Sequence, residues 1–176
     1  MKAPFPYFGG KSKVADIIWA ALGDVDNYVE PFAGSLAVLL ARPHEPKIET
    51  VNDQDALLAN FWRALTADPK SVADYADWPV NEADLEARHF WLVQNRQRIR
   101  DGLGDPEWHD AKAAGWWVWG ISCWIGSGWC SGTGPHWYDG QKWVGNAGQG
   151  INRTRPHLSD AGQGINRNIS IHDYLA

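Results

Sequence analysis

The sequence has only two cysteines among its 176 residues, and it lacks any apolar run of the ~20 residues that a membrane-spanning helix needs. So few cysteines exclude a disulfide-dense secreted scaffold. The first six residues contain no apolar segment of the kind that marks a secretory signal. We therefore expect a cytoplasmic protein that makes no use of a membrane.

Basic residues are scarce in the middle of the chain. The net charge is −5, but residues 1–13 carry +3, residues 14–110 carry −10 and residues 111–176 carry +2. Binding to a polyanion depends on a local basic face rather than on the whole-chain sum. The two ends are therefore the expected places for contact with nucleic acid, and the acidic middle is not.

Tryptophan and glycine are abundant instead. The 12 tryptophans are about five times the ordinary usage for this length. The 18 glycines crowd the last third of the chain, where residues 146–153 recur almost unchanged as residues 160–167. We interpret this repeat as a duplicated Gly-rich loop, because two copies are too few for a repeat array. The overall hydrophobic content of 44% is that of a globular chain with one domain or one domain plus an insertion.

Hydrophobic periodicity divides the chain into three parts. Residues 1–66 are predicted to form an α/β unit, residues 67–125 a helical, Trp-rich region, and residues 126–176 a Gly/Trp-rich region. Helices are expected at 12–22, 36–41, 54–67, 69–75, 82–103 and 106–123, and strands at 28–32 and 47–51. We predict that Ser12, Ser35 and Asn81 cap their helices. The two strands should be parallel and joined by a right-handed crossover.

Two Gly-containing segments in the first part are candidate ligand contacts. In Tyr7-Phe8-Gly9-Gly10-Lys11 the glycines let the backbone approach a ligand closely, although a plain turn with a solvated lysine explains the same residues. Glu30-Pro31-Phe32-Ala33-Gly34-Ser35 joins a strand to a helix, as in the first unit of a nucleoside-binding sheet. The carboxylate of Glu30 suits a cationic or hydroxyl-bearing ligand rather than a phosphate.

An acidic residue ends the second expected strand. Asp53 follows Phe32 by 21 positions, which is where a ribose hydroxyl pair is held in nucleoside-binding sheets. The alternative is that Asp53 caps the helix beginning at Gln54.

The three segments, in this order and spacing, resemble the N-terminal part of the Dam-type (D12 class) DNA adenine-N6 methyltransferases. The resemblance is clear over residues 4–66, and the later part is similar to phage-encoded members. It implies an incomplete Rossmann-like fold that binds S-adenosylmethionine, with the Trp-rich helices as an insertion and residues 126–176 as a target-recognition region. The cofactor-binding residues that it implies are Tyr7, Lys11, Glu30, Phe32, Gly34 and Asp53.

Two departures from the family pattern bear on activity. The catalytic Asp-Pro-Pro-Tyr motif, which clamps the flipped adenine, is absent, and the nearest string is Asp105-Pro106-Glu107-Trp108 at an expected helix start. Leu36 stands where the family usually has a second glycine, so its side chain is able to crowd the cofactor. We therefore assign no catalytic residue, and we expect a truncated or split enzyme that is inactive alone.

Two functions stay open on the sequence. The first is site-specific adenine methylation of double-stranded DNA in a bacterial or phage-infected cell, with a second chain or self-association completing the sheet. The second is a degenerate methyltransferase that binds a protein or nucleic acid without catalysis. Arg153, Arg155 and Arg167, in and beside the repeated loop, are the expected DNA-phosphate contacts, and a solvated loop is the equally weighted alternative.

The cysteines and tryptophans have simpler interpretations. Cys123 and Cys130 lack the paired short spacing of a zinc site, so we expect them to pack in the core and no metal to be bound. Core packing is also the favoured interpretation for four tryptophans of the helical region, and base stacking is the alternative. The four are Trp116, Trp117, Trp119 and Trp124.

Overall fold

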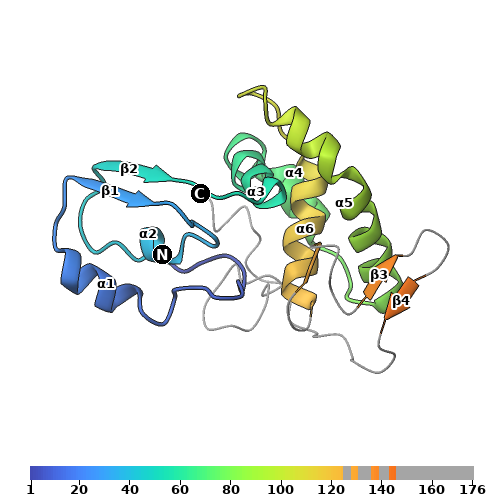
Figure 1. The fold of residues 1–176 in the computed structure, drawn as a ribbon, viewed down its shortest axis with the longest axis horizontal. Coiled ribbons are helices and arrows are strands. Elements are labelled where there is room, and N and C mark those ends of the chain that lie inside the picture. Colours follow the sequence, from blue (N-terminus) through green and yellow to red (C-terminus); the bar gives the residue numbers. More distant parts are fainter. Residues whose placement is uncertain (125–127, 131–135, 139–142, 146–176) are drawn as a thin grey trace.

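The computed structural model describes residues 1–124, 128–130, 136–138 and 143–145 (Figure 1). The repeated loop and the predicted DNA contacts Arg153, Arg155 and Arg167 lie outside the described residues. The elements run in the order α1 (Ala15–Leu22), β1 (Asn27–Glu30), α2 (Ala37–Leu40), β2 (Ile48–Val51), α3 (Ala56–Ala67), α4 (Pro69–Ala76), α5 (Glu82–Gly102), α6 (Ala111–Cys123), β3 (His136–Tyr138) and β4 (Trp143–Gly145).

Strands β1 and β2 form a two-stranded parallel sheet, which confirms the predicted strand orientation. Helices α1 and α2 lie along one side of it (Figure 1). Tyr28 and Glu30 of β1 are buried on this side, where the Trp19 ring of α1 packs 4.9 Å from the Tyr28 ring. Strands β3 and β4 form a separate antiparallel pair.

The other face of the parallel sheet is open. Val29 of β1 is 57% exposed and Ile48 of β2 is 65% exposed, and no residue of β2 is buried. The register pairs Asn27 with Ile48 and Val29 with Thr50, so these four side chains share one face. Parallel sheets in globular proteins are normally covered on both faces. This apolar face is therefore an unpartnered surface of the described fold.

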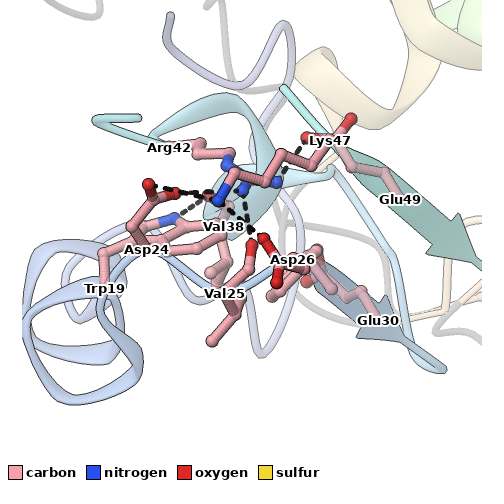
Figure 2. Close-up of polar contacts among 10 residues, drawn as sticks. Trp19, Asp24, Val25, Asp26, Glu30, Val38, Arg42, Lys47 and Glu49 are labelled. Carbon is pink, nitrogen blue, oxygen red and sulfur yellow. Dashed lines mark hydrogen bonds and ion pairs between the residues drawn. The ribbon is translucent and has the colours of Figure 1, made fainter. Parts of the chain in front are cut away.

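Arg42 ties together the amino ends of the two strands (Figure 2). Its guanidinium donates to Glu49 of β2 at 3.0 Å and to the Val25 carbonyl at 2.9 Å. The same group lies over the Trp19 ring at 5.2 Å, and its side chain is only 4% exposed. Lys47 adds an ion pair with Asp26 at 2.8 Å. These contacts hold α1, α2 and the sheet at the end opposite the two Gly-containing segments.

Helices α3 to α6 pack around an aromatic core (Figure 1). The Phe5 ring from the N-terminal segment enters this core, 5.2 Å from Phe61 of α3 and 5.1 Å from Trp117 of α6. Burial of such rings contributes most of the hydrophobic stabilisation of a small core. The N-terminal segment is thereby anchored to the helices on its way to the first Gly-containing segment. The packing interpretation is confirmed for Trp117, Trp119, Trp124, Cys123 and Cys130, which are all buried, whereas Trp116 is only partly buried against the same core.

The predicted elements are all present, but several predicted ends were wrong. Asn81 caps α5 as predicted, accepting from the Asp84 amide at 2.8 Å. Ser12 and Ser35 cap nothing, because α1 begins after Val14 and α2 after Leu36, neither with a side-chain cap.

Helix α6 starts at Ala111 rather than at residue 106, with Asp110 as its cap. The segment Asp105–Trp108 is a turn rather than a helix start. Arg63 of α3 fixes this turn by donating to the carbonyls of Leu103, Asp105 and Trp108. No helix in the described part of the chain is long and apolar enough to cross a membrane.

Candidate functional site

The two Gly-containing segments meet beyond the carboxyl end of β1. The Gly10 amide donates to the Tyr7 carbonyl at 2.8 Å, which closes a tight turn with Gly9 at a φ of +75°. Gly34, at a φ of +53°, lies against the Tyr7 ring so closely that a Cβ there would stand 2.9 Å from it. Because L side chains rarely adopt this φ, glycine is required at residue 34 both for the turn and for the contact.

Lys11 joins the first segment to the strand. Its Nζ atom lies 3.0 Å from Oε1 of Glu30 and donates to the Phe32 carbonyl at 2.7 Å. The other Glu30 oxygen accepts from the Tyr28 hydroxyl at 3.0 Å. Burial and the Glu30 charge raise the pKa of Tyr28 far above its ordinary value, so the phenol stays a donor. Lys11 is thus not a free solvated lysine, and Glu30, 4% exposed, is a paired buried carboxylate.

Asp53 fixes the second Gly-containing segment from the end of β2. Its Oδ2 atom accepts from the Gly34 amide at 2.9 Å, and its Oδ1 atom accepts from the Asp55 amide at 3.1 Å. The cap of α3 is Asp55, which accepts from Leu57, so the capping alternative for Asp53 is wrong. Each Asp53 oxygen keeps a further lone pair with which it can accept from a ligand hydroxyl.

These segments enclose a pocket of about 370 Å³. Ligand pockets usually measure about 300–1,000 Å³, so the cavity is of small-molecule size. Five of the six residues implied by the family resemblance line it: Tyr7, Lys11, Phe32, Gly34 and Asp53. The sixth, Glu30, is not part of the lining and acts on the pocket through Lys11.

Sequence analysis missed an aromatic residue at the pocket. Phe8 lines it and is 84% exposed, and Phe32 of the facing segment is 80% exposed. Two exposed aromatic rings that line the same pocket give it apolar surface, and gathered apolar surface of this kind often marks a binding site. The signal was present in the sequence, because Phe8 lies between Tyr7 and Gly9 in the first motif. Asn52 and Gln54 flank Asp53 in the lining and were missed in the same way.

Leu36 does not occupy the pocket. Its side chain is 9% exposed and does not contribute to the lining, although Ser35 and Ala37 on either side of it do. Its φ of +53° lies in the left-handed region, which explains why a glycine is favoured there. The departure from the family pattern therefore introduces backbone strain rather than a side chain in the pocket.

The electrostatics of the pocket favour a cation or a neutral ligand. Asp53 contributes a negative charge, and the positive charge of Lys11 is already offset by Glu30 behind it. Burial, together with Asp53 and Asp55, raises the pKa of Tyr7 to about 12, so its phenol stays neutral at ordinary pH. The described residues contain no group of three or more metal-ligating side chains. The arrangement suits a ligand with hydroxyls and positive charge.

One comparison with known proteins identifies the family. The geometry is that of a small-molecule site at the carboxyl end of a parallel sheet, the common position for nucleoside ligands. The model of the D12 class N6 adenine-specific DNA methyltransferase family matches residues 7–98, just over half of the chain. The chain therefore belongs to this family, which confirms the resemblance. No curated protein and no solved structure matches the chain, so the family model alone carries the assignment.

Proposed function

We propose that the chain binds S-adenosylmethionine in the pocket between Tyr7 and Asp53, as part of a DNA adenine-N6 methyltransferase. The observation that carries this proposal is the contact of Tyr7 with Gly34, because it joins the two family motifs into one pocket. The exposed rings of Phe8 and Phe32 offer apolar surface to an adenine ring. Asp53 offers carboxylate lone pairs to ribose hydroxyls.

The charges of the site agree with this ligand. Asp53 and the Lys11–Glu30 pair together carry one net negative charge, whereas the cofactor carries a positive sulfonium and an amino-acid group of opposite charges. A nucleoside triphosphate would meet an uncompensated carboxylate instead. When bound, S-adenosylmethionine supplies a methyl group on a positive sulfur atom. The residues of this chain would hold and orient the cofactor.

The chain does not carry the amine clamp that the family uses. Adenine N6 is a weak nucleophile, so methyl transfer needs the amine positioned by acceptors and a stacking ring after base flipping. No Asp-Pro-Pro-Tyr occurs in the sequence, and Asp105–Trp108 lies in a turn fixed by Arg63. We propose that residues outside these 176, on the same or on a second polypeptide, supply this clamp, and that these 176 residues alone transfer no methyl group.

The open face of the parallel sheet supports a second polypeptide. Val29 and Ile48 expose apolar side chains where a Rossmann-like sheet is covered, and two parallel strands form a poor sheet alone. Further strands would extend the sheet at its edges, and the helices that connect them would cover this face. Self-association of the chain is the alternative way to cover the open face. The molecular mass of the purified chain in solution distinguishes a self-associated form from a monomer.

Methyl transfer is tested directly with tritium-labelled S-adenosylmethionine and unmethylated duplex DNA. The purified chain is expected to give no label in DNA above background while still binding the cofactor. Label in DNA that is lost in Phe32→Ala would show that other residues replace the clamp and that the inactive, split form is wrong. Absence of cofactor binding in the folded chain would favour a degenerate, non-catalytic protein instead.

A further inference from the structure

A second cleft adjoins the cofactor pocket. It has a volume of about 680 Å³ and lies between residues 53–55, which follow β2, and one face of α5. Asp53 and Gln54 line both cavities, so the two are direct neighbours. One face of α5 lines the cleft, because the lining residues of this helix follow a helical spacing. They are Val93, Gln94, Arg96, Gln97 and Arg100.

The two arginines of this face differ in their partners. Arg96 is held by Asp55, with Nη2 3.0 Å from the Oδ1 atom, and by the Cys130 carbonyl at 2.9 Å. Its charge is therefore compensated and its position fixed. Arg100, one turn further along α5, is exposed and has no hydrogen bond or ion pair within the described part of the chain. Arg100 is thus the cation of the cleft that is available to an anionic ligand, whereas the Asp53 carboxylate, which lines the cleft as well, disfavours a phosphate close to residue 53.

Amide side chains supply the remaining polar groups of the cleft. Gln54, Gln94 and Gln97 each combine a donor with an acceptor, which is the pattern that pairs with the edge of a nucleobase. The Gln97 amide already donates to Asp101 at 2.7 Å, but Gln54 and Gln94 are exposed and have no such bond among the described residues. A cation beside free amides matches a nucleotide better than a simple anion or an apolar peptide.

We propose that this cleft binds a nucleotide of the DNA strand beside the cofactor, with its phosphate on Arg100 and its base edge on Gln54 and Gln94. The inference rests on the proposed function, because a methyl acceptor must come close to the cofactor pocket and this cleft shares Asp53 and Gln54 with it. It also places a DNA contact in the segment whose overall charge is negative, where the sum over residues 14–110 had argued against one.

Fluorescence anisotropy with a short labelled DNA duplex tests the charge contact, with Arg98→Gln as the matched control. Arg98 lies on the same helix, is half-exposed and pairs with Asp110 outside the cleft. Arg100→Gln is expected to weaken binding several-fold and to reduce the slope of log K against log salt by about 1, as loss of one phosphate contact does. Arg98→Gln should leave both quantities unchanged. Equal losses in the two variants, or none in Arg100→Gln, would overturn the inference.

Gln94→Leu tests the base contact without changing the charge. We expect weaker DNA binding with an unchanged salt slope, because an uncharged contact releases no counterions. Wild-type affinity in this variant would overturn the base assignment. Calorimetric titration with S-adenosylmethionine runs in parallel. None of the three substituted side chains lines the cofactor pocket, so all variants should keep cofactor affinity. Failure of cofactor binding in the wild-type chain would instead refute the proposed function.

Discussion

The Tyr7 ring lies directly against Gly34, so that a Cβ added at Gly34 would stand 2.9 Å from a ring carbon. This contact brings together two segments that are 27 positions apart in the sequence. Since both segments line the pocket, the shape of the site depends on the absence of a side chain at Gly34.

Gly34→Ala is therefore expected to damage the pocket as well as the backbone. The Tyr7 ring must move, and we expect a loss of about 2 kcal/mol in stability and roughly tenfold in S-adenosylmethionine affinity. Gly23→Ala is the matched control, because Gly23 also has a positive φ of +69° but open space around it. The control should also lose stability, because a φ of +69° with a ψ of −160° is almost confined to glycine, but it should lose no affinity. Urea unfolding and calorimetry measure both effects, and equal behaviour of the two variants would contradict the role of the contact.

The Lys11–Glu30 pair should be structural as well as functional. Lys11→Met leaves a buried carboxylate without its cation, and we expect a loss of about 3 kcal/mol in the free energy of unfolding. Lys11→Arg keeps a cation within reach and should retain most of the stability. Urea denaturation of the two variants checks this prediction. If the urea midpoint of Lys11→Met equals that of the wild-type protein, the Lys11–Glu30 pair contributes nothing to the stability of the fold.

Local signals predicted the elements well, and contacts between distant residues explain the errors. Asn81 was predicted as a cap because its partner lies three residues away. The start of α6 was wrong because Arg63, more than forty residues earlier, holds residues 103–108 in a turn. Likewise the capping alternative for Asp53 was wrong, because this side chain accepts from the Gly34 amide across 19 positions, a contact that no local pattern reveals.

The residues that line the pocket were largely predictable because the family motifs are contiguous in sequence. Five of the six expected residues line one pocket, whereas Glu30 lies behind it because alternate strand residues face opposite sides of the sheet. The left-handed φ of Leu36 was not predictable, since leucine rarely adopts it. The open sheet face depends on tertiary packing. The sequence indicated only that a second chain or self-association completes the sheet, and not which face stays exposed.

Leu36→Gly should leave the cofactor site unchanged. Leu36 does not line the pocket, so we expect S-adenosylmethionine affinity within about twofold of wild type. Stability should fall by about 1–3 kcal/mol, because the loss of a buried side chain outweighs the relief of left-handed strain. Leu36→Asn, which tolerates this φ, serves as a second variant. A large gain in cofactor affinity in Leu36→Gly would show that the leucine does crowd the pocket.

Stability at alkaline pH should depend on Tyr7. Its pKa is raised to about 12 in the folded chain by burial and by nearby Asp53 and Asp55. An unfolded tyrosine loses its proton near pH 10, so the folded state binds more protons between about pH 10 and 12. The stabilisation by the neutral phenol is therefore complete below about pH 10 and is lost as the pH rises towards 12.

Tyr7→Phe removes this titration. Urea unfolding from pH 9 upward should show a shallower alkaline loss of stability in the variant than in wild type. Identical slopes in the two proteins would mean that the Tyr7 hydroxyl titrates alike in the folded and unfolded states.

Cofactor binding at the pocket between Tyr7 and Asp53 is the central claim, and calorimetric titration with S-adenosylmethionine tests it most directly. Phe32→Ala removes a ring that lines the pocket, and Ile17→Ala removes an equally exposed apolar side chain on α1 outside it. Both residues are surface-exposed, so neither substitution should disturb the core. We predict saturable binding by wild type and Ile17→Ala, and binding at least several-fold weaker in Phe32→Ala. No heat from the folded wild-type chain at millimolar ligand, or equal affinity in all three proteins, would contradict the account.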